Sequence, residues 1–301
     1  MEAFQQIDLM ARGASIGLFL LWSWILLRDH RDMPAARTAV AMNIAIIGYV
    51  LATSSWDVDP SPVGVVFTLF AGATPGLFWL FARTWFNDKK HLERWALMLI
   101  ALSVANVLAM RLSFGRDDGL NVFCGTLFRI GMLAFAVAGL WEAWRGREGD
   151  LVEVRRRLRP RIAAAVGIYV IIITIAEVAV YDLQAPIWIA RSVGSSIAVI
   201  TLLFCMAMFG MRQSDLFGAA NGKARPAATA PNDDPLVPKL LGHMSAELPH
   251  RDETLSIAKL AAQLGEQEYR LRRAINGQLG HRNFAAFLNG YRLGSYPLQP
   301  L

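Results

Sequence analysis

The stretch VGVVFTLFAGATPGLFWLFARTWF, residues 63–86, decides the fold class of this chain. It carries a single charge, at Arg83, and it exceeds the roughly 20 residues of helix that cross the hydrocarbon core of a bilayer. Because that core offers no water to an exposed backbone, a helix is the conformation we expect. Residues 63–86 therefore predict a membrane-spanning helix.

Six further stretches have a similar length and apolar character, so we predict seven spans. The composition agrees, since 54% of the 301 residues are hydrophobic and the mean hydropathy is +0.36, values that are atypical of soluble domains. The first stretch follows an acidic lead-in and lacks a small-residue cleavage pattern, so we interpret it as a retained helix. The six stretches are residues 9–27, 38–55, 95–113, 120–141, 162–181 and 187–211.

The loops between the predicted spans differ in charge, and this difference predicts orientation. One set of loops holds many Lys and Arg, including seven Arg within residues 145–161, whereas the opposite set holds Arg116 alone. Cytoplasmic loops of membrane proteins retain the excess of positive charge. We therefore expect the N-terminus outside and the C-terminus in the cytoplasm.

Composition changes after the seventh predicted span. Residues 213–234 are rich in Gly, Ala, Pro, Asn and Asp, which do not build a packed core, and we interpret them as a flexible linker. The expected domains are thus a seven-helix membrane domain at residues 1–212, the linker at 213–234, and a cytosolic domain at 235–301.

The stretch LSIAKLAAQLGEQEYRLRRAINGQLG, residues 255–280, predicts two short helices. Apolar residues follow helical spacing over residues 255–264 and stop at Gly265. A second helix starts near Gln267, with Leu271, Ala274 and Ile275 facing inward. Two such helices around a tight turn form a helix-turn-helix, whose second helix enters the major groove of DNA. The expected fold class is therefore all-α, a seven-transmembrane-helix bundle followed by a cytosolic helix-turn-helix domain.

The residues expected on the outward face of the second helix are candidates for DNA binding. Arg suits guanine edges or phosphate, and Tyr can stack or pack against the backbone of DNA. The spacing alone is equally compatible with a basic face that is only solvated. These candidates are Tyr269, Arg270, Arg272 and Arg273.

A longer stretch, LSIAKLAAQLGEQEYRLRRAINGQLGHRNFAAFLNGYRL at residues 255–293, resembles the first helix-turn-helix of the AraC/XylS family of transcriptional regulators. It also resembles the subgroup in which that domain follows a polytopic membrane region. The resemblance implies that Tyr269, Arg272 and Arg273 face the groove. It further implies a membrane-anchored transcriptional regulator in a prokaryotic inner membrane.

The sequence departs from the family in two places. Gln267 stands where the family usually has a Ser or Thr helix cap. Family members carry a second helix-turn-helix, joined by a long helix that would begin near Asn283, but here GSYPLQPL follows at residues 294–301. We expect a regulator truncated after its first helix-turn-helix, with impaired DNA binding. The other interpretation is a short regulator in which a homodimer brings two half-domains together.

Ionisable residues inside predicted spans are costly and suggest function. One hypothesis places Arg111, Arg129 and Arg191 around an outward-facing pocket for an anionic or polar ligand. The alternative is structural: Glu177 pairs with Arg191, while Arg83 and Arg111 extend to the membrane interfaces.

Several functions lack the residues that they need. No Lys lies inside a predicted span, which excludes a retinal Schiff base, and all five His lie outside the spans. We therefore expect no cofactor, no metal site, no catalytic residues and no enzyme activity. The favoured function is a regulator that senses an unknown small-molecule signal through the bilayer-embedded helices and binds DNA. The alternative is a membrane receptor or transporter of small molecules whose degenerate tail does not bind DNA.

Overall fold

The computed structural model describes residues 2–52, 61–87, 92–113, 119–145, 149–152 and 235–293, with isolated positions at 156, 165, 199, 202, 203 and 206. The chain divides into two compact units. The membrane unit comprises Met1–Ala143 and Ile162–Gln213, and the tail unit comprises Trp144–Arg161 and Ser214–Leu301. In the described parts every named element is helical, and one isolated antiparallel bridge joins Asp150 to Asn283. The predicted all-α class is confirmed for these residues.

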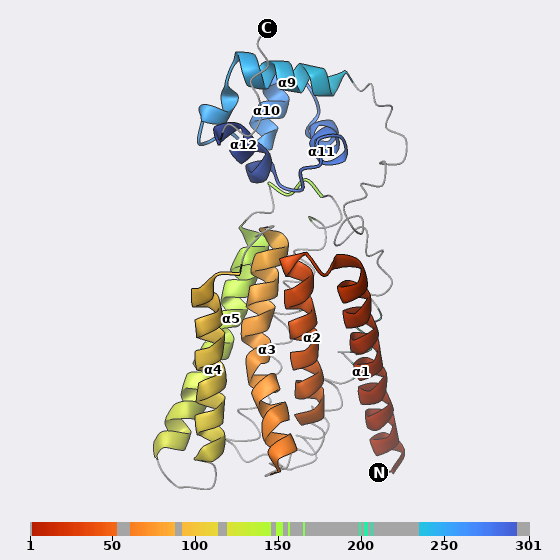
Figure 1. The fold of residues 1–301 in the computed structure, drawn as a ribbon, viewed down its shortest axis with the longest axis vertical. Coiled ribbons are helices and arrows are strands. Elements are labelled where there is room, and N and C mark those ends of the chain that lie inside the picture. Colours follow the sequence, from red (N-terminus) through yellow and green to blue (C-terminus); the bar gives the residue numbers. More distant parts are fainter. Residues whose placement is uncertain are drawn as a thin grey trace. The chain divides into compact units, whose positions relative to one another are not determined.

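Five helices of the described membrane unit are long and apolar enough to span a membrane (Figure 1). They coincide with the first five predicted spans to within four residues, except at the start of α1. The predicted spans at residues 162–181 and 187–211 lie outside the described residues. The helices are α1 (Glu2–His30), α2 (Pro34–Ala52), α3 (Pro62–Phe86), α4 (Arg94–Leu112) and α5 (Gly119–Trp144).

The ends of these helices follow local chemistry. α3 starts as its sequence indicates: the backbone N–H of Gly64 donates to the Ser61 hydroxyl at 3.1 Å, and Pro62 occupies the first helical position. α1 differs from the prediction, because it begins at Glu2 and the acidic lead-in is helical. Within it Arg12 donates to the Asp8 carboxylate at 2.9 Å, one helical turn away, and to the Val50 carbonyl of α2 at 2.6 Å.

Glycines allow α3 and α4 to approach closely. A Cβ atom placed on Gly72 would lie 2.6 Å from the Val107 side chain, and one on Gly76 would lie 2.8 Å from the Ile100 side chain. Small residues at such contacts are typical of membrane helices, where association depends on close packing. The helix contact thus requires glycine at both positions.

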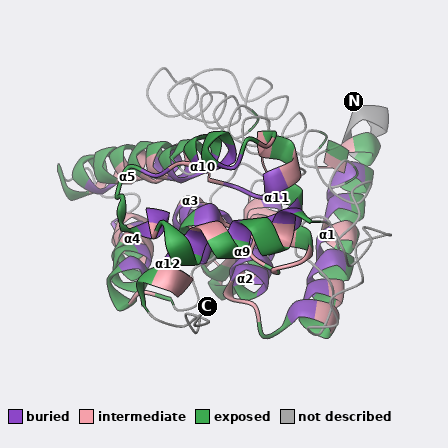
Figure 2. Ribbon diagram, turned by 90° about the horizontal axis from the view of Figure 1, so that it is seen from above, coloured by how far each residue is buried: buried purple, intermediate pink, exposed green. Residues whose placement is uncertain are grey.

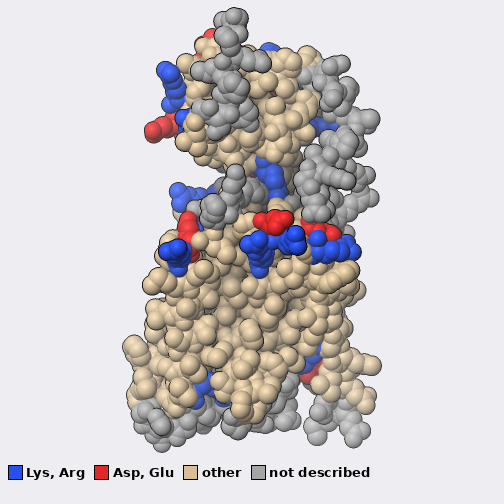
Figure 3. Space-filling view, in the orientation of Figure 1, with Lys and Arg blue, Asp and Glu red and all other residues tan. Residues whose placement is uncertain are grey.

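The surface of the membrane unit separates apolar and charged residues. Large hydrophobic side chains such as Met98, Leu102, Phe123 and Val137 are exposed on α4 and α5, which is typical of lipid-facing helices. Exposed residues recur along the length of α5 in Figure 2. Lys, Arg, Asp and Glu gather at the end of the unit where α1, α3 and α5 finish and α2 and α4 begin (Figure 3). The described helices are therefore compatible with a multi-pass membrane protein.

The described part of the tail unit after residue 234 contains five short helical elements. The turns between them use the residues that the sequence offers: Gly265 and Gly280 adopt positive φ angles of 66° and 73°, and the Asn283 side chain accepts the Ala285 N–H at the start of the last helix. The elements are α9 (Leu236–Ala246), the 3-10 helix η3 (Pro249–Arg251), α10 (Ile257–Gln263), α11 (Glu268–Gly277) and α12 (Phe284–Arg292).

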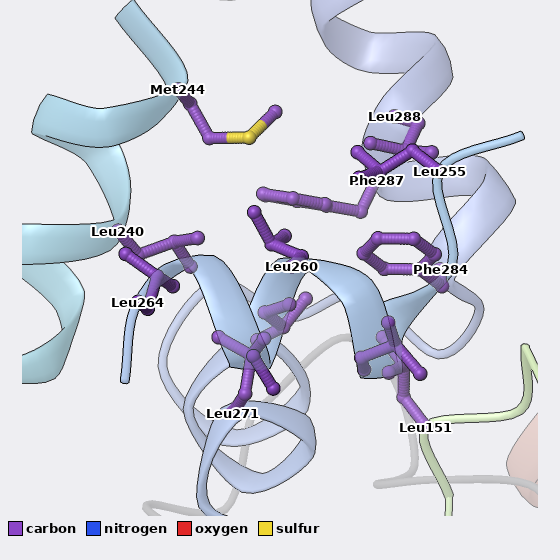
Figure 4. Packing of buried hydrophobic residues seen from close by; sticks show 13 residues of the cluster. Leu151, Leu240, Met244, Leu255, Leu260, Leu264, Leu271, Phe284, Phe287 and Leu288 are labelled. Atoms are coloured by element: carbon purple, nitrogen blue, oxygen red, sulfur yellow. The ribbon is translucent and has the colours of Figure 1, made fainter. Parts of the chain in front are cut away.

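These elements enclose one hydrophobic cluster, the tail core (Figure 4). One member, Leu151, comes from a segment far away in the sequence, and it is only 3% exposed. All other members lie between positions 240 and 288. They are Leu240, Met244, Leu255, Ile257, Leu260, Ala261, Leu264, Leu271, Ile275, Phe284, Phe287 and Leu288.

Candidate nucleic-acid interface

The pair α10 and α11 has the local geometry that the sequence predicts. The Ser256 hydroxyl accepts the Lys259 N–H at 3.2 Å and caps α10, and Gly265 begins the turn with its positive φ angle. Gln267 precedes α11 without a side-chain capping hydrogen bond, as expected from the missing hydroxyl. The predicted bounds of the first helix and the predicted start of the second are thus confirmed to within two residues.

The inward face of α11 is also confirmed. Leu271, Ala274 and Ile275 are buried in the tail unit, and Leu271 and Ile275 belong to the tail core. Their spacing of three and four residues places them on one side of the helix. The opposite side of α11 is consequently directed away from the tail core.

Two of the four candidate DNA-binding side chains are exposed there. Tyr269 is 64% exposed, and Arg273 is exposed and forms no ion pair within the described residues. Arg270 is half-buried, and it donates to the Glu266 carboxylate at 2.8 Å. Such a pair, one turn apart on a partly solvated helix, is weak and leaves Arg270 able to exchange partners.

Arg272 does not lie where the sequence led us to expect it. It is 7% exposed, so the expectation that it faces outward is wrong in this conformation. Its guanidinium donates to the Glu268 carboxylate one helical turn earlier and, through Nη1, to the backbone carbonyl of Asp150 at 2.6 Å. The cause is a long-range contact, because Asp150 lies 122 residues earlier in the chain. Its role in DNA binding stays a prediction.

Asp150 belongs to a short segment, residues 149–152, which we call the docking segment. It runs antiparallel to the start of α12: the Leu151 N–H donates to the Arg282 carbonyl at 3.1 Å, and the Phe284 N–H donates to the Gly149 carbonyl at 2.9 Å. The Asp150 carboxylate accepts the Val152 N–H at 3.1 Å. The docking segment is therefore fixed by both backbone bonds and the buried side chain of Leu151.

Sequence analysis did not identify the docking segment, although a signal was present. Leu151 and Val152 form an isolated apolar pair within the basic loop WRGREGDLVEVRRRLRPR, residues 144–161. A buried anchor is one reason for a large apolar residue in a charged loop. The partner of that anchor was not readable, because the tail core is formed by four separate helices, α9, α10, α11 and α12.

Two histidines of the tail unit have shifted pKa values: His250 on η3, and His281 next to the contact with the docking segment. Burial and the neighbouring charges of Arg251 and Arg292 lower the pKa of His250, whose ring stacks on Tyr291 at a centroid distance of 5.5 Å. Burial likewise lowers the pKa of His281, the residue that precedes the strand-like contact with the docking segment. Both imidazoles are therefore favoured in their neutral form.

The predicted ligand pocket of the membrane unit is described only in part. Arg111 on α4 and Arg129 on α5 are both half-buried. Glu177 and Arg191 lie outside the described residues. Both the pocket and the Glu177–Arg191 ion pair therefore stay predictions.

A charged network at the C-terminal end of α3 was not predicted from the sequence. Arg83 donates to the Glu142 carboxylate at 2.9 Å and to the Glu93 carboxylate at 2.7 Å, and Asn87 donates to Glu142 at 2.6 Å. The Arg83 guanidinium also lies over the Trp95 ring, 4.9 Å from its centroid. Arg83 thus joins three helix ends instead of simply extending to the interface. Glu142 was overlooked because it directly follows the predicted span at 120–141.

The described residues include no group of three or more His, Cys, Asp or Glu that could hold a metal ion. Comparison of the chain with protein-family models, with curated proteins and with solved structures found no match. The resemblance to the AraC/XylS family consequently depends on the residues of the tail quoted above.

Proposed function

We propose that this chain is a membrane-anchored one-component transcriptional regulator, in which the membrane unit senses a small-molecule signal and the tail unit binds DNA. The observation that carries the proposal is the exposed face of α11. This helix follows a tight turn, buries Leu271 and Ile275, and presents Tyr269 and Arg273 to solvent. A helix with one face in a core and a basic face outward suits insertion into the major groove.

Each exposed side chain has a proposed role. Arg273 contacts phosphate or a guanine edge, and Tyr269 packs against the sugar-phosphate backbone or a base. Arg270 adds a further phosphate contact after leaving Glu266, because DNA phosphate competes for the same guanidinium. The docking segment is proposed to govern access to Arg272, as argued below.

The proposed location is a prokaryotic inner membrane, with the N-terminus outside and the tail in the cytoplasm. The five apolar helices and the charges at one end of the membrane unit (Figure 3) support this orientation through the positive-inside rule. A homodimer is proposed because two copies of α11 contact more phosphates than one copy does.

The experiment that tests DNA binding uses the full chain in lipid nanodiscs and a mixed-sequence DNA duplex. We expect micromolar or weaker binding that falls with added salt, because released counterions drive non-specific binding. Arg273→Ala should weaken binding and reduce the slope of log K against log salt by about 0.9, the value for one phosphate contact.

The matched control is Arg251→Ala, an exposed arginine on η3. It changes the net charge equally but lies on another element, so the salt slope should match that of the unmodified chain. Equal losses from both variants would mean that DNA responds only to overall charge, and α11 would lose its proposed role.

A second candidate function is a membrane receptor or transporter whose tail does not bind DNA. The burial of Arg272, with its guanidinium on Glu268 and Asp150, favours this candidate, because a principal DNA contact implied by the family resemblance is engaged internally. It predicts no binding to the duplex at any salt concentration. The nanodisc experiment therefore separates the two candidates.

A further inference from the structure

The docking segment connects two parts of the molecule by a short piece of chain. Gly149 follows Trp144, the last residue of α5, by five residues. A connection of five residues extends at most about 18 Å, even when fully stretched. A displacement of the end of α5 that takes up the slack of this connection therefore pulls on the docking segment, whereas the predicted linker at residues 213–234 is far longer.

The attachment of this segment to the tail is small and local. Among the described residues it includes one buried side chain, Leu151, two backbone hydrogen bonds to residues 282 and 284, and the bond from Arg272 to Asp150. All other members of the tail core lie on residues 240–288, so the tail keeps most of its core when the segment leaves. Segments with few contacts open at a lower free energy than a whole domain.

Detachment changes the environment of one side chain on α11. In the docked arrangement the Arg272 guanidinium is 7% exposed and donates to Asp150 at 2.6 Å. Removal of the segment takes away that carbonyl and uncovers the guanidinium, while Glu268 on the same helix stays within reach. An uncovered guanidinium on a partly solvated helix can exchange a carboxylate partner such as Glu268 for phosphate.

We propose that residues 149–152 form a detachable regulatory clamp that sequesters Arg272 when docked and exposes it to DNA when a change in the membrane unit displaces α5. This inference rests on the proposed DNA-binding function of α11. If undocking strengthens DNA binding by a given factor, bound DNA shifts the docking equilibrium towards the undocked segment by the same factor. The signal reaches α11 through the clamp.

The test is a reversible disulfide that locks the clamp. Asp150 and Asn283 face each other as a non-hydrogen-bonded antiparallel pair, since the backbone bonds join their neighbours. Such pairs have Cα atoms about 4.5 Å apart, within the range of disulfides. The variant carries Asp150→Cys and Asn283→Cys together with Cys124→Ser and Cys205→Ser, in the full chain in nanodiscs.

The oxidised and reduced forms of this variant serve as matched samples, because they differ only in the cross-link. We expect the oxidised form to bind a mixed-sequence duplex about tenfold more weakly. The slope of log K against log salt should be smaller in magnitude by about 0.9, the value for one phosphate contact. Adding Arg272→Ala should weaken the reduced form and leave the oxidised form unchanged. Equal or tighter binding after oxidation overturns the clamp, while the proposed DNA binding stands.

Absence of binding in the reduced form and in the unmodified chain has a different meaning: the proposed function is then wrong, and the clamp on Arg272 is wrong with it. A second variant guards against a misfolded cysteine pair. Leu151→Ala loosens the docking and should raise DNA affinity several-fold, whereas Leu293→Ala, at a side chain that is 79% exposed, should not. Unchanged or weaker binding by Leu151→Ala overturns the proposal.

Discussion

The membrane unit and the tail unit differ in how far along the chain their contacts extend. In the membrane unit, helices that follow one another in sequence pack together: α1 on α2, α2 on α3, and α3 on α4. The tail core instead includes Leu151, and Arg272 bonds to a carbonyl 122 residues earlier. The first unit therefore follows from local patterns, whereas the second is completed by a segment that local patterns do not assign to it.

The two units also satisfy their polar groups differently. In the membrane unit polar side chains meet across helices, as Thr38 and Thr84 do at 2.8 Å and Asn43 and Ser23 at 3.1 Å. Such bonds are needed where no water replaces them. In the tail unit charged side chains pair one turn apart at the surface, as in Arg270 and Glu266. Only Arg272 combines burial with a long-range partner among the arginines of α11.

The largest effect is expected from Leu151→Asp, which tests whether the tail needs its distant segment. It removes a buried leucine and places a carboxylate against apolar neighbours, so the free energy of unfolding of the tail should fall by about 2–4 kcal/mol. Hydrogen exchange followed by mass spectrometry should show faster exchange in peptides from α10, α11 and α12.

The control for this variant is Leu293→Asp, the same change at an exposed position. It should alter the stability of the tail by about 0.5 kcal/mol or less. Equal exchange in the two variants would mean that Leu151 adds no stability to residues 235–293, and the contrast between the units would disappear.

The next effect concerns a contact that is local to the membrane unit. Gly72→Leu places side-chain atoms against Val107, where even a Cβ would lie 2.6 Å away, so α3 and α4 must separate. We expect a loss of about 1–3 kcal/mol, measured as a lower midpoint of unfolding in detergent. Gly125→Leu is the matched control, since a Cβ on Gly125 meets no atom within 4 Å. A similar midpoint for both variants would contradict this packing.

These contrasts explain how much of the fold was predictable. The helices α3 and α5 match their predicted spans closely, because length and hydropathy are local properties. The turn at Gly265 and the inward residues of α11 were equally readable, since positive φ favours glycine and apolar spacing identifies a buried face. Boundaries were less exact, as the early start of α1 at Glu2 shows.

The candidate site was only partly predictable for a physical reason. Helical spacing places Arg272 next to Tyr269 and Arg273, but it does not reveal which residues a distant segment covers. The Asp150 carbonyl is a backbone group, so no residue type marks it as an acceptor. Glu142 was missed for another reason, because it directly follows the predicted span at 120–141 and was not considered with Arg83, its partner on a different helix.

A smaller effect is expected from Glu142→Gln in the membrane unit. The change removes the charge that Arg83 meets at 2.9 Å, but Arg83 keeps Glu93 and remains partly solvated, so we expect a loss of about 1–2 kcal/mol. Unfolding in detergent measures it. Asp29→Asn, which alters the more exposed pair with Arg28, should cost less stability than Glu142→Gln. The reverse order would mean that the network around Arg83 is not structural.

The smallest effect is a dependence of the stability of the tail unit on pH. The folded tail lowers the pKa of His250 from its ordinary value of 6.5, through burial and the charges of Arg251 and Arg292. Below about pH 6.5 the unfolded chain therefore binds more protons than the folded chain does, and the free energy of unfolding falls as the pH falls. The loss ends below the folded pKa, where both states are protonated. His281 adds to this loss with the same sign.

His250→Phe should remove part of that loss, because the ring stacked on Tyr291 remains aromatic but no longer titrates. Urea midpoints from hydrogen exchange of α12 peptides, corrected for the intrinsic pH dependence of exchange, measure the difference between pH 7.5 and 5.5. The variant should show the flatter dependence, with His281 responsible for what remains. If the variant and the unmodified chain lost equal stability, His250 would already be protonated in the folded tail, and its burial beside two arginines would not govern its charge.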